Sequence, residues 1–399
     1  MLYGLMAALL LVVAVFAAVD LVPMARAWTG RIHIGRYAAV ERWAEAIVRK
    51  GVRWLNRTPK IKVTDNTRLI LLDMLKGNYA RSAIQHWQEA ALLLGLAERV
   101  RLAGADPELL AQADRYLAAT FDSDGQWREK PRQVDGAILA YAVMTWPAAD
   151  PDRYRPAWDH VRQMIEQHLG DDGTVLYRQA MKDYRYVDTI GFVCPFLVVY
   201  GLRYGRPDCL RLAVKQIREY EKHGMLQEPF LPFHAYDVRR RLPLGLYGWG
   251  RGLGWYAIGL IDAWAALPDG HEAKEELERS VVRFARSAIA CQQPQGNWNW
   301  TATRPEARAD SSATAALAWF LVQAAKIGEI AAPATEAAGK AIRYLMSVTR
   351  RDGAVDFSQG DTKDIGVYSM LFDILPFTQG LSIRAVHAYQ RLQKDRGRP

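Results

Sequence analysis

The sequence predicts an all-α fold: an (α/α)6 barrel, or six-hairpin toroid, with an N-terminal transmembrane helix. Three observations predict it. Apolar and amphipathic helical segments alternate along the chain, Asp-Gly and similar turns recur every ~50 to 70 residues, and the first twenty residues are almost uninterruptedly apolar. Half of the 399 residues are hydrophobic, which is enough for one large core.

The first element is the apolar run at residues 2–19, which ends at Asp20. Its length of about 18 residues is just enough to cross a bilayer. Signal peptides normally have a basic residue before the apolar run, and this sequence has none. However, Ala25-Arg26-Ala27 offers a small-x-small cleavage pattern. We expect residues 1–25 to be a retained membrane anchor, and a cleaved signal peptide is the alternative.

Basic residues follow the anchor closely, at Arg26, Arg31 and Arg36. Because positive residues flanking a membrane helix tend to stay in the cytoplasm, they favour a cytoplasmic body on the inner membrane. We expect residues 26–399 to form a single catalytic domain.

Two sets of helices are expected beyond the anchor. Six segments are apolar nearly all round, as buried helices are: 83–100, 136–146, 189–204, 252–267, 311–327 and 379–392. Six amphipathic segments alternate with them: 39–56, 107–120, 155–169, 208–222, 272–291 and 334–349. An open solenoid of helical hairpins would show a similar alternation. The number of pairs is six, and a loop with glycine, polar and aromatic residues precedes the inner helices. Both features favour a closed ring instead.

The turns that separate these pairs contain a glycine in the motifs FDSDGQW, DDGTVLY, KHGML, QGNWNW and RDGAVDF. Asp-Gly is a typical turn dipeptide. Each turn therefore ends one helical hairpin and leads toward the next inner helix.

Charge and cysteine content narrow the function. The net charge of +9 and the pI near 9.4 favour an anionic partner. No dense basic run or zinc-finger signature indicates nucleic acid, so an acidic saccharide or an anionic lipid surface is expected. Cys194, Cys209 and Cys291 form no metal-ligand pattern, and we expect no metal and no cofactor.

Two aspartates directly precede predicted inner helices, Asp135 in QVDG and Asp188 in YVDTIG. Either alone is explained as an N-cap, because an Asp side chain accepts from the first free N–H groups of a helix. Together they occupy equivalent positions in adjacent repeats and would face each other across one mouth of a barrel. Two carboxyls in different surroundings are what acid/base chemistry on a glycoside needs.

The segment from Phe233 to Tyr256 combines glycines with polar and aromatic residues. Its glycines would let a ligand approach the backbone closely. Arg251 would grip a carboxylate bidentately, and Trp249 and Trp255 would stack on a sugar. The alternatives are a packed Gly-rich helix entry, with Arg251 paired to a carboxylate such as Asp237.

Three further positions belong to the same predicted mouth. His234 is a candidate hydrogen-bond partner for substrate, although a loop histidine is as often structural. Gln379 begins the last inner helix and is a candidate substrate-binding residue. Asp310 precedes Ser311-Ser312, which lack the elbow of a serine nucleophile and are better explained by an N-cap.

In combination, these motifs resemble glycoside hydrolase families 88 and 105, the unsaturated glucuronyl and unsaturated rhamnogalacturonyl hydrolases. The motifs, in order, are Val187-Asp188-Thr189, Pro195-Phe196-Leu197, His234-Ala235-Tyr236-Asp237, the segment from Trp249 to Tyr256, Asp310-Ser311-Ser312 and Gln379-Gly380. The resemblance covers most of the chain from about residue 80 onward.

The resemblance implies an (α/α)6 barrel that hydrates the C4=C5 double bond of a terminal unsaturated uronic acid. An Asp protonates the double bond, water adds at C5, and the resulting hemiketal opens and expels the sugar. Asp188 matches the principal acid/base residue and Asp135 the second aspartate. His234, Arg251 and Trp255 match positions that bind the uronate or the neighbouring sugar.

The chain departs from the family pattern at Leu253, where the family often has Asn, and in the anchor, which soluble members lack. The anchor favours exopolysaccharide or capsule metabolism over catabolism. The main hypothesis is thus a hydrolase of acidic oligosaccharides. The alternative is a catalytically altered carbohydrate-binding component that works with polysaccharide-assembly proteins in the membrane.

Overall fold

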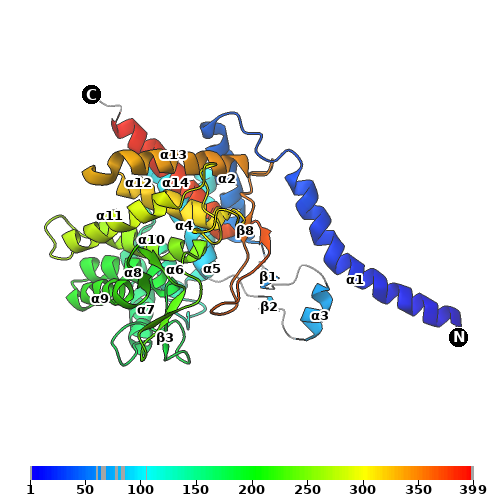
Figure 1. Cartoon of the computed structure of the whole chain (residues 1–399), viewed down its shortest axis with the longest axis horizontal. Coiled ribbons are helices and arrows are strands. Elements are labelled where there is room, and N and C mark those ends of the chain that lie inside the picture. Colours follow the sequence, from blue (N-terminus) through cyan, green and yellow to red (C-terminus); the bar gives the residue numbers. More distant parts are fainter. Residues whose placement is uncertain are drawn as a thin grey trace.

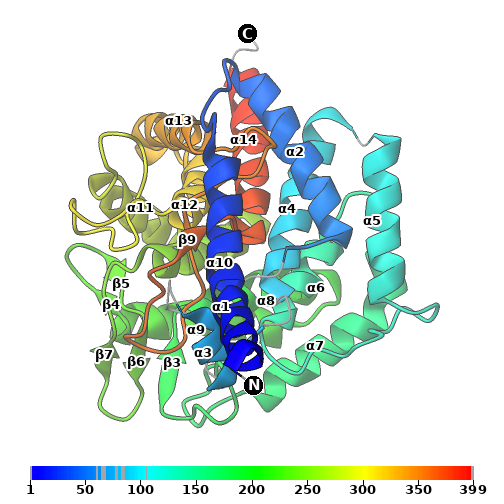
Figure 2. The same ribbon diagram turned by 90° about the vertical axis from the view of Figure 1, so that its right-hand side faces the viewer.

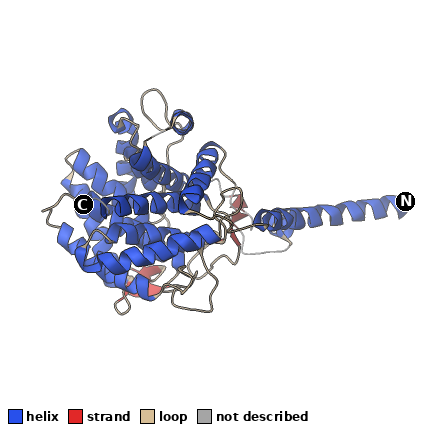
Figure 3. Cartoon of the chain, turned by 90° about the horizontal axis from the view of Figure 1, so that it is seen from above, coloured by secondary structure: helices blue, strands red, loops and turns tan. Residues whose placement is uncertain are grey.

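The computed structural model describes residues 2–59, 62–63, 69–76, 80–81, 86–104 and 106–396. Helices dominate these residues, and short strands form small sheets at separate places in the molecule (Figures 1 and 3). Two layers of helices form the body, and a single long helix projects from it.

The inner layer is a closed ring of six helices. They are α4 (His86–Ala103), α6 (Gly136–Met144), α8 (Asp188–Arg203), α10 (Gly250–Ala266), α12 (Ser311–Ala324) and α14 (Pro376–Arg396). Each contacts the next in this order, and α14 packs along α4 to complete the circle (Figure 2). The predicted barrel is confirmed, because an open solenoid would leave its first and last helices apart. Residues 83–85 of the first predicted inner helix lie outside the described residues.

Closure of the ring depends on two glycines, Gly95 of α4 and Gly380 of α14. A Cβ atom on Gly95 would lie 2.1 Å from the carbonyl oxygen of Gly380, and one on Gly380 would lie 2.1 Å from Ala91. The two backbones therefore cross in direct contact, and no larger residue fits at either position.

The outer layer covers this ring with six amphipathic helices. They are α2 (Val40–Asn56), α5 (Pro107–Thr120), α7 (Arg155–Gln167), α9 (Pro207–His223), α11 (Lys274–Ala290) and α13 (Ala331–Ser347). In α2, Trp43 and Ile47 are buried whereas Glu41 and Arg53 are exposed. This spacing is the one-sided pattern of a helix that covers a core. Two 3-10 helices, η1 (Pro151–Tyr154) and η2 (Gly328–Ile330), precede α7 and α13.

Four of the five predicted glycine turns have the expected left-handed backbone, with φ between 69° and 95° at Gly125, Gly173, Gly296 and Gly353. Gly224 differs, because it directly follows α9 with a φ of −109° and needs no left-handed conformation.

Short antiparallel strands occupy the connections. They are β1 (Lys62–Val63), β2 (Ala80–Arg81), β3 (Tyr184–Tyr186), β4 (Met225–Leu226), β5 (Leu231–Pro232), β6 (Ala235–Asp237), β7 (Leu242–Leu244), β8 (Ser358–Gln359) and β9 (Phe372–Asp373). Strands β3, β6 and β7 form one sheet, in which Tyr186 pairs with Ala235. This register brings the start of α8 beside residue 234.

The projecting helix is α1 (Leu2–Arg31), which leaves the barrel on the side of β8 (Figure 1). Among the described residues it is the one helix long and apolar enough to cross a membrane. It continues past the expected boundary at residue 25 to Arg31. The short helix α3 (Ile70–Leu75) contacts it, because the Asp20 carboxylate accepts from the backbone N–H groups of Leu69 and Ile70.

Candidate active site

A cavity of about 50 Å³ lies at the N-terminal ends of inner helices α8 and α10. The residues that line it are mostly aromatic or charged: Trp87, Tyr177, Met181, Tyr186, Asp188, Phe192, His234, Trp249, Arg251, Trp255 and residues 361–364. Five of the seven residues predicted for the site are in this set.

Asp188 is the first residue of α8, and only Val187 separates it from the end of β3. The backbone N–H of Val187 donates to the carbonyl oxygen of His234 at 3.0 Å, which holds this turn against the neighbouring loop. The side chain of Asp188 is 14% exposed, and its buried Oδ2 atom has no hydrogen-bond partner among the described residues. A buried oxygen without a donor is costly, so this carboxyl is not explained as a structural cap.

The surroundings of Asp188 favour its protonated form. Burial raises the pKa of its carboxyl to about 7, and the negative charge of Asp361 adds to the rise. The positive charges of Arg251 and Arg178 oppose it. Near neutral pH, a large share of the molecules therefore carries a proton on Asp188, as a general acid requires.

His234 faces the same carboxyl. Its Nε2 atom is 3.9 Å from Oδ2 of Asp188, and its Nδ1 atom is 3.2 Å from the hydroxyl of Tyr368. Burial lowers the pKa of His234 to about 4, and the nearby Arg251 adds to the effect. The imidazole is thus neutral at pH 7 and cannot hold Asp188 in its charged form.

Arg251 is a buried guanidinium in the first turn of α10. It donates to the carbonyl oxygens of Gln359 (2.6 Å) and Gly360 (2.7 Å) and to the hydroxyl of Thr362 (3.3 Å). Among the described residues no carboxylate lies within 4 Å of it. Asp237, the expected alternative partner, accepts instead from the backbone N–H of Arg240. A buried guanidinium held only by neutral acceptors remains available to an anionic group.

Tryptophans form the walls beside these groups. The Trp249 indole N–H donates to Oε1 of Gln359, and its ring lies 4.5 Å from the ring of His234. Trp255 packs edge-on against Trp87 and Phe192. These contacts fix the orientation of both rings.

Asp135 stands at the start of α6, but its carboxylate makes no cap hydrogen bond. It lies 3.6 Å from Nδ1 of His86 and 3.9 Å from Nη1 of Arg178. The Arg178 guanidinium in turn lies 4.1 Å from the ring centre of Tyr177, a cavity residue. Asp135 is therefore not among the residues that line the cavity, but is connected to it through this neighbour.

The structure places Gln379 away from the cavity. Its buried amide accepts from the backbone N–H of Val355 and donates to the carbonyl oxygens of Ile47 and Gly353. All of its hydrogen-bonding groups are used to hold the last glycine turn against α2. This differs from the substrate-binding role expected from its position before Gly380.

Asp310 is a helix cap, as expected. Its carboxylate accepts from the backbone N–H and hydroxyl of Ser312 and from the backbone N–H of Gln359. In the described part of the chain, no group of three or more His, Cys, Asp or Glu side chains is arranged to hold a metal ion.

Tyr177, Tyr186 and residues 361–364 also line the cavity but were not predicted from the sequence. The available signal for the latter was the connection between the Gly353 turn and α14, which is long and carries the polar run GDTKD. Nothing local shows that this run reaches back to α8 and α10.

Comparison with known proteins identifies the family. The model of the family described as Glycosyl Hydrolase Family 88 matches residues 61–385. Protein Atu3128 of Agrobacterium fabrum is 30% identical over 163 residues, which cover 38% of this chain and 69% of that protein. A 24.9 kDa protein in the picA locus of Rhizobium radiobacter matches to the same extent.

Solved structures share the fold at low identity. A possible member of glycoside hydrolase family 105 from Klebsiella pneumoniae aligns with a TM-score of 0.74 and 19% identity, covering 90% of this chain and 95% of its own. An unsaturated glucuronyl hydrolase from Bacillus sp. GL1 aligns at 0.66 and 16%, covering 90% and 100%. One described as specific for heparin aligns at 0.67 and 14%, covering 89% and 98%. With the family model matched along most of its length and the barrel closed as in these structures, the chain belongs to glycosyl hydrolase family 88 and is a glycoside hydrolase.

Proposed function

We propose that this enzyme hydrolyses oligosaccharides that end in an unsaturated uronic acid, with Asp188 as the proton donor. One observation carries the proposal: the buried Asp188 carboxyl, with a pKa of about 7, lines the same cavity as a buried guanidinium, and one of its oxygens has no hydrogen-bond partner in the described part of the chain. The description of two structural relatives as unsaturated glucuronyl hydrolases supports the substrate class.

In the proposed reaction, protonated Asp188 donates its proton to C4 of the C4=C5 double bond. Positive charge then develops at C5 and on the ring oxygen. Water adds at C5 and returns a proton to the Asp188 carboxylate, so the residue ends the cycle as it began. The resulting hemiketal opens and releases the sugar that was attached at C1. A donor with a pKa near the working pH suits both proton transfers.

The residues around the Asp188 carboxyl would bind the substrate. Arg251 would bind the uronate carboxylate, and neutral His234 would hydrogen-bond a hydroxyl without competing for the proton of Asp188. Trp249 and Trp255 would pack on the sugar rings. Asp135 would act from behind the cavity, by positioning Arg178 and Tyr177.

Entry of a sugar requires the cavity to widen. A volume of about 50 Å³ holds only a few water molecules, whereas ligand pockets typically measure ~300–1,000 Å³. Residues 361–364 line the cavity from a loop between β8 and β9, and we expect these side chains to shift when substrate binds.

The reaction is tested directly by incubating the purified enzyme with unsaturated uronyl disaccharides and following the absorbance of the C=C bond. Loss of absorbance in the parent, and none in Asp188→Asn, supports the proposal. A parent that leaves every such disaccharide intact contradicts it.

Recognition is tested by calorimetry with a uronate-terminated oligosaccharide and its carboxyl-reduced, neutral analogue. A shielded Arg–carboxylate contact is worth about 1.5–3 kcal/mol, so the acid should bind roughly ten- to a hundredfold more tightly. Equal affinities, or an Arg251→Ala enzyme that binds the acid as well as the parent does, would remove Arg251 from the model.

We also infer that α1 is a retained anchor that holds the barrel on the cytoplasmic side of the inner membrane. The helix is unbroken from Leu2 to Arg31, and its last residue is bound to the barrel. Membrane fractionation should find the full-length protein in the membrane. A soluble protein that begins near Trp28 would instead show a cleaved signal peptide.

A further inference from the structure

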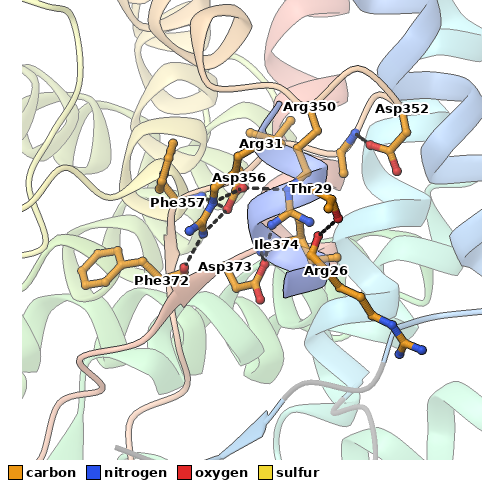
Figure 4. Close-up of polar contacts among 12 residues, drawn as sticks. Arg26, Thr29, Arg31, Arg350, Asp352, Asp356, Phe357, Phe372, Asp373 and Ile374 are labelled. Atoms are coloured by element: carbon orange, nitrogen blue, oxygen red, sulfur yellow. Dashed lines mark hydrogen bonds and ion pairs between the residues drawn. The ribbon is translucent and has the colours of Figure 1, made fainter. Parts of the chain in front are cut away.

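The last residue of α1 makes specific contacts with the barrel (Figure 4). The Arg31 guanidinium binds both carboxylate oxygens of Asp356, with Nε to Oδ2 at 2.8 Å and Nη2 to Oδ1 at 3.1 Å. Nη2 also donates to the carbonyl oxygen of Phe372 at 2.9 Å. Such a bidentate contact fixes the orientation of both partners.

These two acceptors lie on the two sides of one small hairpin, formed by β8 and β9. Asp356 precedes β8 by two residues, and Phe372 is the first residue of β9. Phe372 pairs directly with Gln359 across the hairpin. Arg31 therefore clamps both strands at the base of the loop whose residues 361–364 line the active site.

The hairpin also holds two active-site side chains. The carbonyl oxygen of Gln359 accepts from Arg251, and its side-chain oxygen accepts from Trp249. Gln359 is three residues from Asp356, so the chain between them spans at most ~11 Å. Only one strand thus separates the end of α1 from the groups proposed to bind the uronate.

We call the contact of Arg31 with Asp356 and Phe372 the clamp. The backbone between the clamp and Gln359, which binds the active-site side chains, is constrained. Phe357, which lies between Asp356 and β8, has a left-handed φ of 60°, unusual for a residue other than glycine. The Arg31 guanidinium lies over its ring, 4.7 Å from the centre. Such conformations persist only where surrounding contacts enforce them.

We propose that Arg31 is a positioning residue, through which α1 fixes the β8–β9 hairpin and thereby the orientation of Arg251 and Trp249. The proposal rests on the proposed function in that it takes these two side chains as the uronate-binding groups. It gives α1 a second role beside anchoring, because a change at its end would reach the active site.

Replacement of Arg31 should leave the barrel folded. Buried Asp356 keeps a second partner, since Nε of Arg350 binds it at 2.7 Å. The matched control is Arg218, whose guanidinium also binds one carboxylate through two hydrogen bonds, to Glu276 on the outer surface. Arg31→Gln and Arg218→Gln thus remove the same kind of contact at two places. Arg31→Lys keeps the positive charge but cannot make the bidentate contact.

The first measurement is hydrogen–deuterium exchange of the full-length protein in detergent, which needs no substrate. Arg31→Gln should accelerate exchange in peptides covering residues 356–373, and Arg218→Gln should not. Unchanged exchange in these peptides would overturn the proposal, whatever the enzyme does. If Arg31→Gln does not fold, Arg31→Lys provides the same comparison with a smaller expected acceleration.

The second measurement is steady-state kinetics on an unsaturated uronyl disaccharide. Because ~1 Å of misplacement can cost up to ~100-fold, we expect Arg31→Gln to raise KM about tenfold, with a smaller change in kcat. Binding of the carboxyl-reduced analogue should weaken less, because it can lose only the packing on Trp249 and not the contact with Arg251. A purely structural role would move neither KM nor the preference for the acid, and that result would also overturn the proposal. Faster exchange in Arg31→Gln, together with a parent that is inactive on all unsaturated uronides, would leave the clamp in place and reject the proposed function.

Discussion

Among the places where the barrel buries charged side chains, two differ sharply in how those charges are partnered. At the mouth, Oδ2 of Asp188 has no hydrogen-bond partner among the residues that the structure describes, and it lies 3.9 Å from Nε2 of the neutral His234. Toward the far end of the inner helices, Arg384 binds Asp262 at 2.7 Å, and the second oxygen of Asp262 accepts from the indole N–H of Trp319. Asp262 lies eleven residues beyond Arg251 on α10, or ~16 Å along the helix axis.

Most hydrogen-bonding atoms of Arg384 and Asp262 have partners, although Nε of Arg384 has none among the described residues. The Arg384 guanidinium also lies 3.7 Å from the ring centre of Trp319 and reaches the hydroxyl of Tyr141 at 3.4 Å. Although burial opposes it, the charge of Asp262 raises the pKa of Arg384. These contacts connect α6, α10, α12 and α14 across the ring.

The difference shows how one core can hold both a scaffold and a site. Charges that satisfy each other define how helices pack, although they add little net stability. A carboxyl left short of partners costs stability but keeps its proton near neutral pH, where it can react. The following predictions, from the largest expected effect to the smallest, test whether the two regions are as distinct as their contacts indicate.

The largest effect should come from Asp188→Asn. Loss of the proton donor is expected to reduce kcat by ~10²–10⁴-fold, measured as initial rates on unsaturated uronyl disaccharides. Asp152→Asn, at an exposed aspartate on the outer surface, is the control and should be fully active. An Asp188→Asn enzyme with more than a tenth of the parent rate would show that another group donates the proton.

At the far end, Arg384→Met should act on stability instead. It leaves Asp262 buried without its partner, which costs ~3–5 kcal/mol, visible as a lower unfolding temperature by circular dichroism in mild detergent. Adding Asp262→Leu should restore much of the loss, since an apolar pair replaces the ionic one. The activity per folded molecule should stay at the parent level. A selective loss of activity in stable Arg384→Met would mean that the two regions are coupled.

The fold was largely predictable because its signals are local. The inner and outer helices differ in whether apolar residues surround the helix or follow one face, and this difference is visible in the sequence. The predicted start of α6 at residue 136 and the predicted span of α2 agree with the structure to within one residue. Closure was expected from the number of pairs, but the contact that achieves it, Gly95 against Gly380, joins distant segments and has no local signature.

The site was predictable only in part for the same reason. Asp188, Trp249 and Arg251 begin inner helices, so the barrel architecture itself brings them together. Gln379 also lies in the first turn of an inner helix, yet its side chain binds the backbone of a neighbouring turn. Periodicity places a residue on an element but does not show which groups it satisfies. The loop at 361–364 reaches the cavity through tertiary contacts alone.

The third prediction concerns the cost of the unpartnered carboxyl. The folded pKa of Asp188, about 7, lies above the ordinary value of 3.8 that applies when the chain is unfolded. Its contribution to stability is therefore fully present below pH 3.8 and is lost as the pH rises through about 7.

Asp188→Asn removes this loss. At pH 8 the variant should be more stable than the parent by on the order of 1–4 kcal/mol, since each tenfold change in proton affinity is worth about 1.4 kcal/mol. At pH 4 the two should unfold at similar temperatures. If Asp188 were mainly an N-cap, the substitution would instead cost stability, typically ~1 kcal/mol for a lost cap, and thermal melts at the two pH values distinguish these signs.

The smallest effect is expected from Asp135→Asn. This variant tests whether a residue that does not line the cavity contributes to activity. Asp135 contacts His86 and Arg178 rather than the cavity itself, and Arg178 lies over the ring of Tyr177. Although burial opposes it, the Asp135 carboxylate raises the pKa of His86. We therefore expect kcat/KM to fall by about tenfold, as for a group that positions others, and the unfolding temperature to change little.

His86→Gln should produce a similar loss, and the double variant should lose less than the two single losses combined, because both residues act through one contact. A loss as large as that of Asp188→Asn would place Asp135 among the groups that take part in proton transfer. No loss at all would show that Asp135, like Asp262, has only a structural role. Activity would then depend only on the residues that line the cavity.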